Sequence, residues 1–75
     1  MSRPRKRSFS IAGHRTSVSL EPQFWAALQE IASGRNMSLA GLVAEIDAGR
    51  ANSGLSTAIR LHVLAFYQQR SSPRR

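Results

Sequence analysis

Polar and apolar residues alternate between Arg15 and Leu20, and this alternation predicts a β-strand. Val18 and Leu20 would lie on one face, because successive side chains of a strand point to opposite sides. The opposite face would carry Arg15, Ser17 and Ser19. The strand is therefore expected to have one apolar face and one small, polar and basic face.

Three later segments repeat apolar residues at the helical spacing i, i+3, i+4, i+7. They predict helices from Pro22 to about Ser33, from Ser38 to about Arg50, and over residues 55–69. Pro is favoured in the first turn of a helix, Gly34 would supply the left-handed residue that ends the first helix, and the Ser38 hydroxyl would cap the second. The third helix is apolar around so much of its circumference that it needs more than one neighbour, either within the chain or from a second chain.

The strand lacks an obvious partner, because nothing after it resembles a second strand and unpaired backbone groups are unfavourable. Ser8–Ile11 alternates, and Ala12-Gly13 could turn that segment back onto residues 14–20. Two-residue hairpin loops, however, favour Asn, Asp or Gly at the position that Ala12 occupies. We therefore expect residues 1–13 to form a flexible basic arm and the partner strand to come from a second chain.

The order of strand, helix, short turn and helix over SVSLEPQFWAALQEIASGRNMSLAGLVAEI, residues 17–46, resembles the ribbon-helix-helix family of DNA-binding proteins. The resemblance implies a mostly α fold with one short N-terminal β-strand, paired between two chains of an obligate homodimer. The third helix would be an addition to the minimal family pattern. The domain would span residues 14–70, followed by a basic tail over 71–75.

The resemblance also implies a DNA-binding site. In this family the two-stranded ribbon enters the DNA major groove, which is wide enough to admit it. The outward residues Arg15, Ser17 and Ser19 would contact bases, with Arg15 able to pair with both guanine O6 and N7. By the same analogy, the start of the second helix at Ser38 would direct its free N–H groups at a phosphate.

Positive charge is concentrated at the two ends of the chain. Residues 1–20 carry a net charge of +5 with no acidic residue, residues 70–75 carry +3, and the segment between them carries −1. Mobile basic side chains contact DNA phosphates regardless of sequence, although a basic arm can also serve only solubility. The predicted phosphate contacts, besides Ser38, are Arg3, Arg5, Lys6, Arg7 and His14.

Several other classes of protein are disfavoured. The 75-residue chain has no cysteine, and it contains neither a nucleophile–base pair, nor paired carboxylates, nor a phosphate-binding glycine loop, so we expect no enzyme. His62 has no metal-ligating neighbour at helical spacing, so we expect no metal and no cofactor. No apolar run reaches the roughly 20 residues that span a bilayer, which predicts a soluble, cytoplasmic protein without a membrane partner.

Two functions remain open. The first is a sequence-specific DNA-binding homodimer that acts as a transcriptional regulator of the repressor type. The second is a protein-interaction module, such as an antitoxin, that uses the third helix over 55–69 to hold a protein partner. The short tail over 71–75 favours the regulator, because antitoxins usually carry a longer toxin-binding tail.

Overall fold

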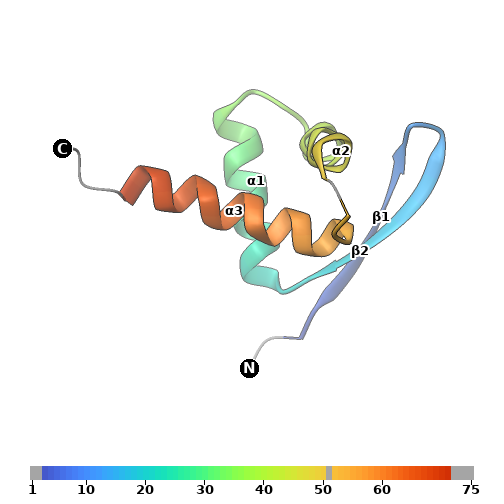
Figure 1. The fold of residues 1–75 in the computed structure, drawn as a ribbon, viewed down its shortest axis with the longest axis horizontal. Coiled ribbons are helices and arrows are strands. Elements are labelled where there is room, and N and C mark those ends of the chain that lie inside the picture. Colours follow the sequence, from blue (N-terminus) through green and yellow to red (C-terminus); the bar gives the residue numbers. More distant parts are fainter. Residues whose placement is uncertain (1–2, 51, 72–75) are drawn as a thin grey trace.

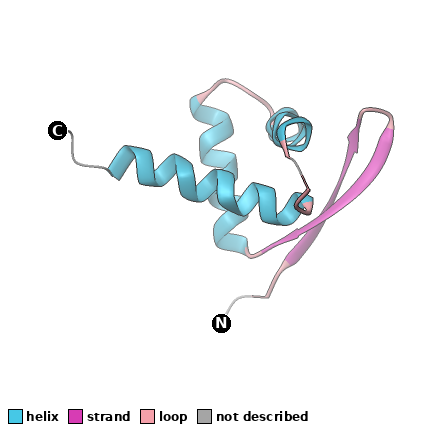
Figure 2. Ribbon diagram, in the orientation of Figure 1, coloured by secondary structure: helices cyan, strands magenta, loops and turns pink. Residues whose placement is uncertain are grey.

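The computed structural model describes residues 3–50 and 52–71. A β-hairpin leads into three helices, as Figures 1 and 2 show: β1 (Arg5–Ile11), β2 (His14–Leu20), α1 (Pro22–Gly34), α2 (Leu39–Gly49) and α3 (Leu55–Ser71). The hairpin runs along one side of the helical part, and α3 extends toward the opposite side (Figure 1). The mostly helical fold class is thereby confirmed. The predicted basic tail lies, except for Ser71, outside the described residues.

The hairpin corrects the expected source of the second strand. β1 pairs antiparallel with β2 over seven residue pairs, from Arg5 opposite Leu20 to Ile11 opposite His14. The partner strand therefore comes from the same chain, and the chain has two strands in place of the single one expected. Residues 5–11, expected to belong to a flexible arm, form β1.

The turn between the strands explains why the sequence was misleading. Ala12 and Gly13 have φ angles of 52° and 81°, and positive φ at both loop residues is what a type I′ turn requires. Glycine adopts this backbone readily, whereas the same backbone is unfavourable by about 1–2 kcal/mol for an L-residue such as alanine. Seven cross-strand pairs and the burial of Ile11 and Val18 outweigh that local cost.

One face of the hairpin closes the hydrophobic core. Val18 and Leu20 are 1% and 0% exposed, as the alternation predicted, and Ile11 of β1 joins them. The helices contribute Trp25, Leu28, Ile31, Ala32, Leu42, Val43, Ile46, Leu55, Ile59 and Val63. None of the buried residues among those described is classed as polar or charged, so the core is held mainly by apolar packing.

The end of α1 differs from the sequence prediction in one residue. The left-handed position is taken by Asn36, with a φ angle of 57°, and not by Gly34. The N–H of Met37 donates to the carbonyl of Ala32, and the N–H of Asn36 donates to that of Ser33. This double closure is the Schellman motif, and asparagine tolerates its left-handed position better than other non-glycine residues do.

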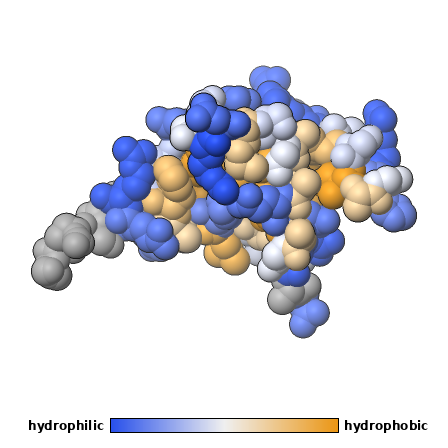
Figure 3. Space-filling view, turned by 90° about the horizontal axis from the view of Figure 1, so that it is seen from above, coloured by the Kyte–Doolittle hydropathy of each residue, from blue (hydrophilic) through white to orange (hydrophobic). Residues whose placement is uncertain are grey.

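α3 packs on α1, α2 and β2, so it has several neighbours within the chain, as its broad apolar surface predicted. Even so, Leu61 and Leu64 remain 57% and 51% exposed on its outer side. Seen from above, apolar patches break the hydrophilic surface of the molecule (Figure 3). The intrachain contacts of α3 therefore leave part of its apolar surface open.

Candidate nucleic-acid interface

The outward face of the hairpin is polar on both strands. Arg15, Ser17 and Ser19 of β2 are exposed, which agrees with the predicted faces of the strand. The pairing register sets three exposed residues of β1 opposite them, namely Ser10 opposite Arg15, Ser8 opposite Ser17, and Lys6 opposite Ser19. Ser8 and Ser10 were not among the site residues predicted from the sequence, although the alternation of residues 8–11 was a signal for them.

This face offers hydrogen-bonding groups and positive charge without a carboxylate. Ser8 and Ser17 lie with their Oγ atoms 3.3 Å apart, within hydrogen-bond distance, and no residue of either strand is acidic. Two strands lie about 4.8 Å apart, so the ribbon fits a major groove of about 12 Å. The face can therefore donate to and accept from base edges, and it attracts a polyanion.

All four acidic residues of the chain lie outside the hairpin, and each is bound to a donor. The ion pairs are Glu21 with Arg60 at 3.0 Å, Glu45 with Arg35 at 2.7 Å and Asp47 with Arg50 at 2.7 Å, and Glu30 accepts a hydrogen bond from the Tyr67 hydroxyl. Hydrogen bonds lower the pKa of Glu21, chiefly the one from its own backbone N–H and then the one from Arg60. The acidic side chains thus lie outside the ribbon, where arginines offset the charge of three of them and the Tyr67 hydroxyl hydrogen-bonds the fourth.

Arg5 and Arg7 do not share the outward face, because they pair with Leu20 and Val18 and point to the helical side of the ribbon. There the Arg7 guanidinium lies 5.0 Å from the centre of the Trp25 ring, and the Trp25 Nε1–H donates to the Arg5 carbonyl oxygen at 2.9 Å. Both arginines line a surface groove of about 430 Å³ between β1 and α1. The predicted phosphate contacts are thus divided between two sides of the ribbon.

The other predicted phosphate contacts are scattered. Arg3 is exposed just before β1, Lys6 lies on the outward face, and His14 is exposed beside the hairpin turn. Ser38 begins α2, the helix that packs beside β1, and its Oγ accepts a hydrogen bond from the Gly41 N–H at 2.9 Å. This bond confirms the predicted helix cap.

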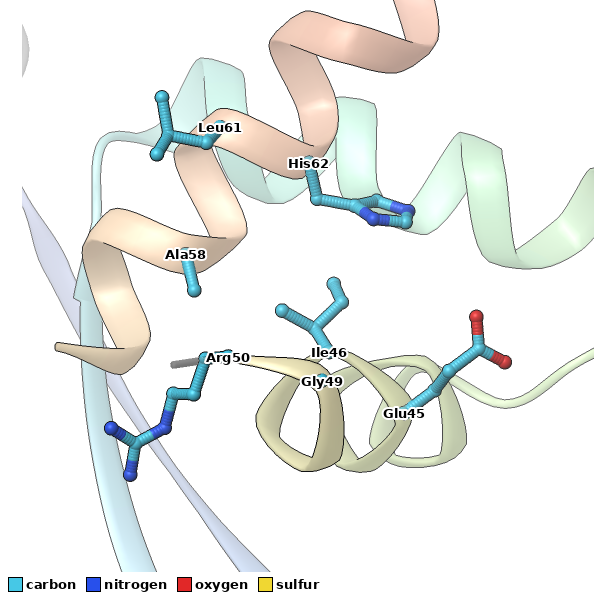
Figure 4. Close-up of a pocket in the computed structure, with 7 residues that line it drawn as sticks. All are labelled: Glu45, Ile46, Gly49, Arg50, Ala58, Leu61 and His62. Atoms are coloured by element: carbon cyan, nitrogen blue, oxygen red, sulfur yellow. The ribbon is translucent and has the colours of Figure 1, made fainter. Parts of the chain in front are cut away.

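A second groove of about 330 Å³ lies between α2 and α3 (Figure 4). Ile46 points toward α3, while the His62 ring and the Glu45 carboxylate lie at one end of the groove (Figure 4). Glu45 is already held by Arg35, and no group of three potential metal ligands occurs within residues 3–50 and 52–71. This groove is therefore a depression with a mixed lining, in which the exposed Leu61 is one of the apolar residues.

No described helix is long and apolar enough to cross a membrane.

A protein-family model described as a ribbon-helix-helix domain matches residues 4–67. The chain therefore belongs to the ribbon-helix-helix family, whose members are in general DNA-binding transcription regulators. The match includes β1 and most of α3, so both elements belong to this variant of the domain. Searches among curated proteins and among solved structures found no match.

Proposed function

We propose that this protein is a sequence-specific DNA-binding regulator of transcription, of the repressor type, which inserts its own β-hairpin into the DNA major groove. The observation that carries the proposal is the outward face of the ribbon, where six exposed polar or basic side chains stand in two register-matched rows. The family membership of the chain supports the same ligand. From this proposed ligand we infer a cytoplasmic location.

In this proposal the residues of the outward face read bases. Arg15 has a planar guanidinium that can donate to both O6 and N7 of guanine, and no described acidic residue pairs with it. Ser17 and Ser19 can donate to or accept from either base pair, and Ser8 and Ser10 of β1 extend the reading row. Each chain then supplies a complete two-stranded ribbon.

The phosphate contacts surround this ribbon. Arg3, just before β1, and Lys6 within it bring positive charge, and His14 offers a ring N–H donor at the turn. Ser38 marks the start of α2, where free backbone N–H groups and the helix dipole favour a phosphate. These contacts set orientation and affinity but carry no sequence information.

The proposal also includes a homodimer, formed through α3. A missing strand no longer calls for a second chain, because β1 supplies that strand. The surface of α3, however, does call for a second chain, because Leu61 and Leu64 are the two large apolar side chains left exposed among the described residues. If a second copy docks about a two-fold axis, the exposed strip formed by Leu61 and Leu64 lies against the same strip of the partner, and both leucines of each copy become buried.

The reading role is tested with Arg15→Ala on an operator selected from random duplexes, with Arg70→Ala as the matched control. Arg70 is an exposed arginine at the far end of α3, so its loss removes the same charge. Arg15→Ala should cost about 1–3 kcal/mol on the preferred site, which is about 5–150-fold in affinity, and relax base preference at one position. An equal, sequence-independent loss for both variants would refute a reading role for Arg15.

The dimer is tested by analytical ultracentrifugation at micromolar concentration. The wild-type chain should sediment as a dimer and the double variant Leu61→Ser/Leu64→Ser as a folded monomer, while Gln69→Ser, another exposed change on α3, stays dimeric. A monomeric wild-type chain would contradict the homodimer. The exposed strip would then favour the second candidate, a module that binds another protein through α3.

A further inference from the structure

We propose that the groove between β1 and α1 is a built binding site for one phosphate of the DNA backbone, held by Arg5 and Arg7. This inference rests on the proposed function, since it names how the bound duplex is held beside the reading ribbon. Six residues line the groove: Arg5, Arg7, Pro22, Trp25, Ala26 and Gln29. Among them, Trp25 positions the two arginines, and the arginines determine which ligand the groove can accept.

Trp25 fixes the backbone that carries the arginines. Its side chain is 5% exposed, and its Nε1–H donates to the Arg5 carbonyl oxygen at 2.9 Å. Its ring also packs against Phe9 of β1, with the ring centres 6.0 Å apart. A buried indole that bonds one end of β1 and packs on its middle holds this strand against α1. Arg5 and Arg7 thus project from an anchored backbone.

The two guanidinium groups remain available to a ligand. Arg7 lies over the Trp25 ring at 5.0 Å, a cation–π contact that orients the group without using its N–H donors. The three ion pairs among the described residues involve Arg35, Arg50 and Arg60, so neither arginine of the groove is neutralised by a described carboxylate. Two like charges two residues apart on one strand face favour an anion between them.

The remaining walls favour a phosphate over a base. Pro22 and Ala26 are small and apolar, while the exposed Gln29 can present an amide donor. A nucleobase would need an aromatic face for stacking, and the Trp25 ring is buried beneath Arg7. The groove, at about 430 Å³, is large enough for a phosphate with its sugar. Its recognition would therefore depend on charge and not on base sequence.

The position of the groove agrees with this ligand. Lys6, Ser8 and Ser10 of β1 face outward, whereas Arg5 and Arg7 of the same strand face the α1 side. A ribbon lying in the major groove has sugar-phosphate backbones along its flanks, since these form the walls of the groove. One strand would thus present base-reading side chains and, on its other face, a phosphate clamp.

The decisive comparison is Arg7→Gln with Arg70→Gln, in the full chain. Both changes remove one arginine that lies over an aromatic ring, at 5.0 Å from the Trp25 centre and 5.5 Å from the Phe66 centre. Arg7→Gln should weaken the preferred site and a random duplex by the same factor. The substitution should also flatten the slope of log affinity against log salt by about 0.9 for each phosphate that the variant no longer neutralises. For one phosphate, the loss of affinity between 50 and 200 mM salt would then be smaller by a factor of about 3.5 than for the wild-type chain. Arg70→Gln should leave that slope unchanged, and Arg7→Lys, which keeps the charge, should largely retain it.

Trp25 provides a second readout, because it is the single tryptophan of the chain. Titration of the protein with a 12-base-pair duplex should shift Trp25 emission as Arg7 turns toward the phosphate, and the shift should be absent in Arg7→Gln. Circular dichroism melting of each variant serves as the control that it is folded.

The two proposals can fail separately. If Arg15→Ala leaves base preference unchanged while Arg7→Gln flattens the salt slope and abolishes the emission shift, the reading role fails and the phosphate site stands. If Arg15→Ala alters base preference while Arg7→Gln changes neither slope nor emission, the phosphate site is overturned.

Discussion

The hairpin turn allows a sharp test of the structure, because its first residue is one that the turn does not favour. Ala12 has a φ angle of 52°, which is unfavourable by about 1–2 kcal/mol for an L-residue without a side-chain hydrogen bond. Asparagine visits this region more readily, and Asn-Gly is a preferred pair for the type I′ turn. Ala12→Asn should therefore raise the free energy of unfolding by about 1 kcal/mol, which is about 4–8 °C in melting temperature for a chain of this size.

Gly13→Ala provides the matched opposite change. Gly13 has a φ angle of 81°, and a Cβ added there would meet no atom within 4 Å, so its cost arises from the backbone alone. The substitution should lower the free energy of unfolding by about 1 kcal/mol. Both variants are measured by thermal and urea unfolding at one fixed protein concentration, because coupling to a dimer makes the midpoint depend on concentration.

A turn without the positive φ angles would give the opposite pair of results. If residues 12 and 13 were flexible or extended, as in a ribbon made only between chains, Ala12→Asn would bring no gain. Gly13→Ala would then be neutral or stabilising, because alanine restricts the unfolded chain more than glycine does. That pair of outcomes would reject the intrachain hairpin.

Three further predictions concern the core and the helical surface. Val18→Ser should lower the free energy of unfolding by about 3 kcal/mol in urea denaturation, because the residue is 1% exposed and the hydroxyl gains no partner; an unaffected fold would mean that the strand faces are assigned in reverse. The hydrogen bond to Glu30 raises the pKa of Tyr67 above 10.0, so the stability that this bond provides is present below pH 10 and is lost as pH rises through the folded pKa. Absorbance titration of this single tyrosine should show the raised midpoint, and Glu30→Gln should lower that midpoint. The hydrogen bond from Arg35 lowers the pKa of Glu45 below 4.5, so the stability that this pair provides is present above pH 4.5 and is lost as pH falls through the folded pKa. In acid unfolding curves, Glu45→Gln should lose less stability over this pH range than the wild-type chain, and identical curves would contradict the pairing.

Half of the proposed reading face was predictable from the sequence. The alternation around Val18 assigned Arg15, Ser17 and Ser19 to the exposed side, and the structure agrees. The β1 half was missed, because the unfavourable Ala12 weighed against a hairpin and left residues 5–11 in an expected flexible arm. The opposite orientations of Lys6 and Arg7 follow only from the strand register, which a flexible arm does not have.

The features that depend on neighbours within about one helical turn could be predicted from the sequence. The three helices, the Ser38 cap and the apolar face of β2 all follow from local spacing and local hydrogen bonds. The strand that pairs with β2 and the place where Trp25 anchors β1 became visible only in the folded chain. These outcomes depend on cross-strand bonds and core burial summed over many residues. That sum exceeds the local cost at Ala12, whereas the sequence pattern shows only the unfavourable Ala12 and the short alternation of residues 8–11, without the weight of either.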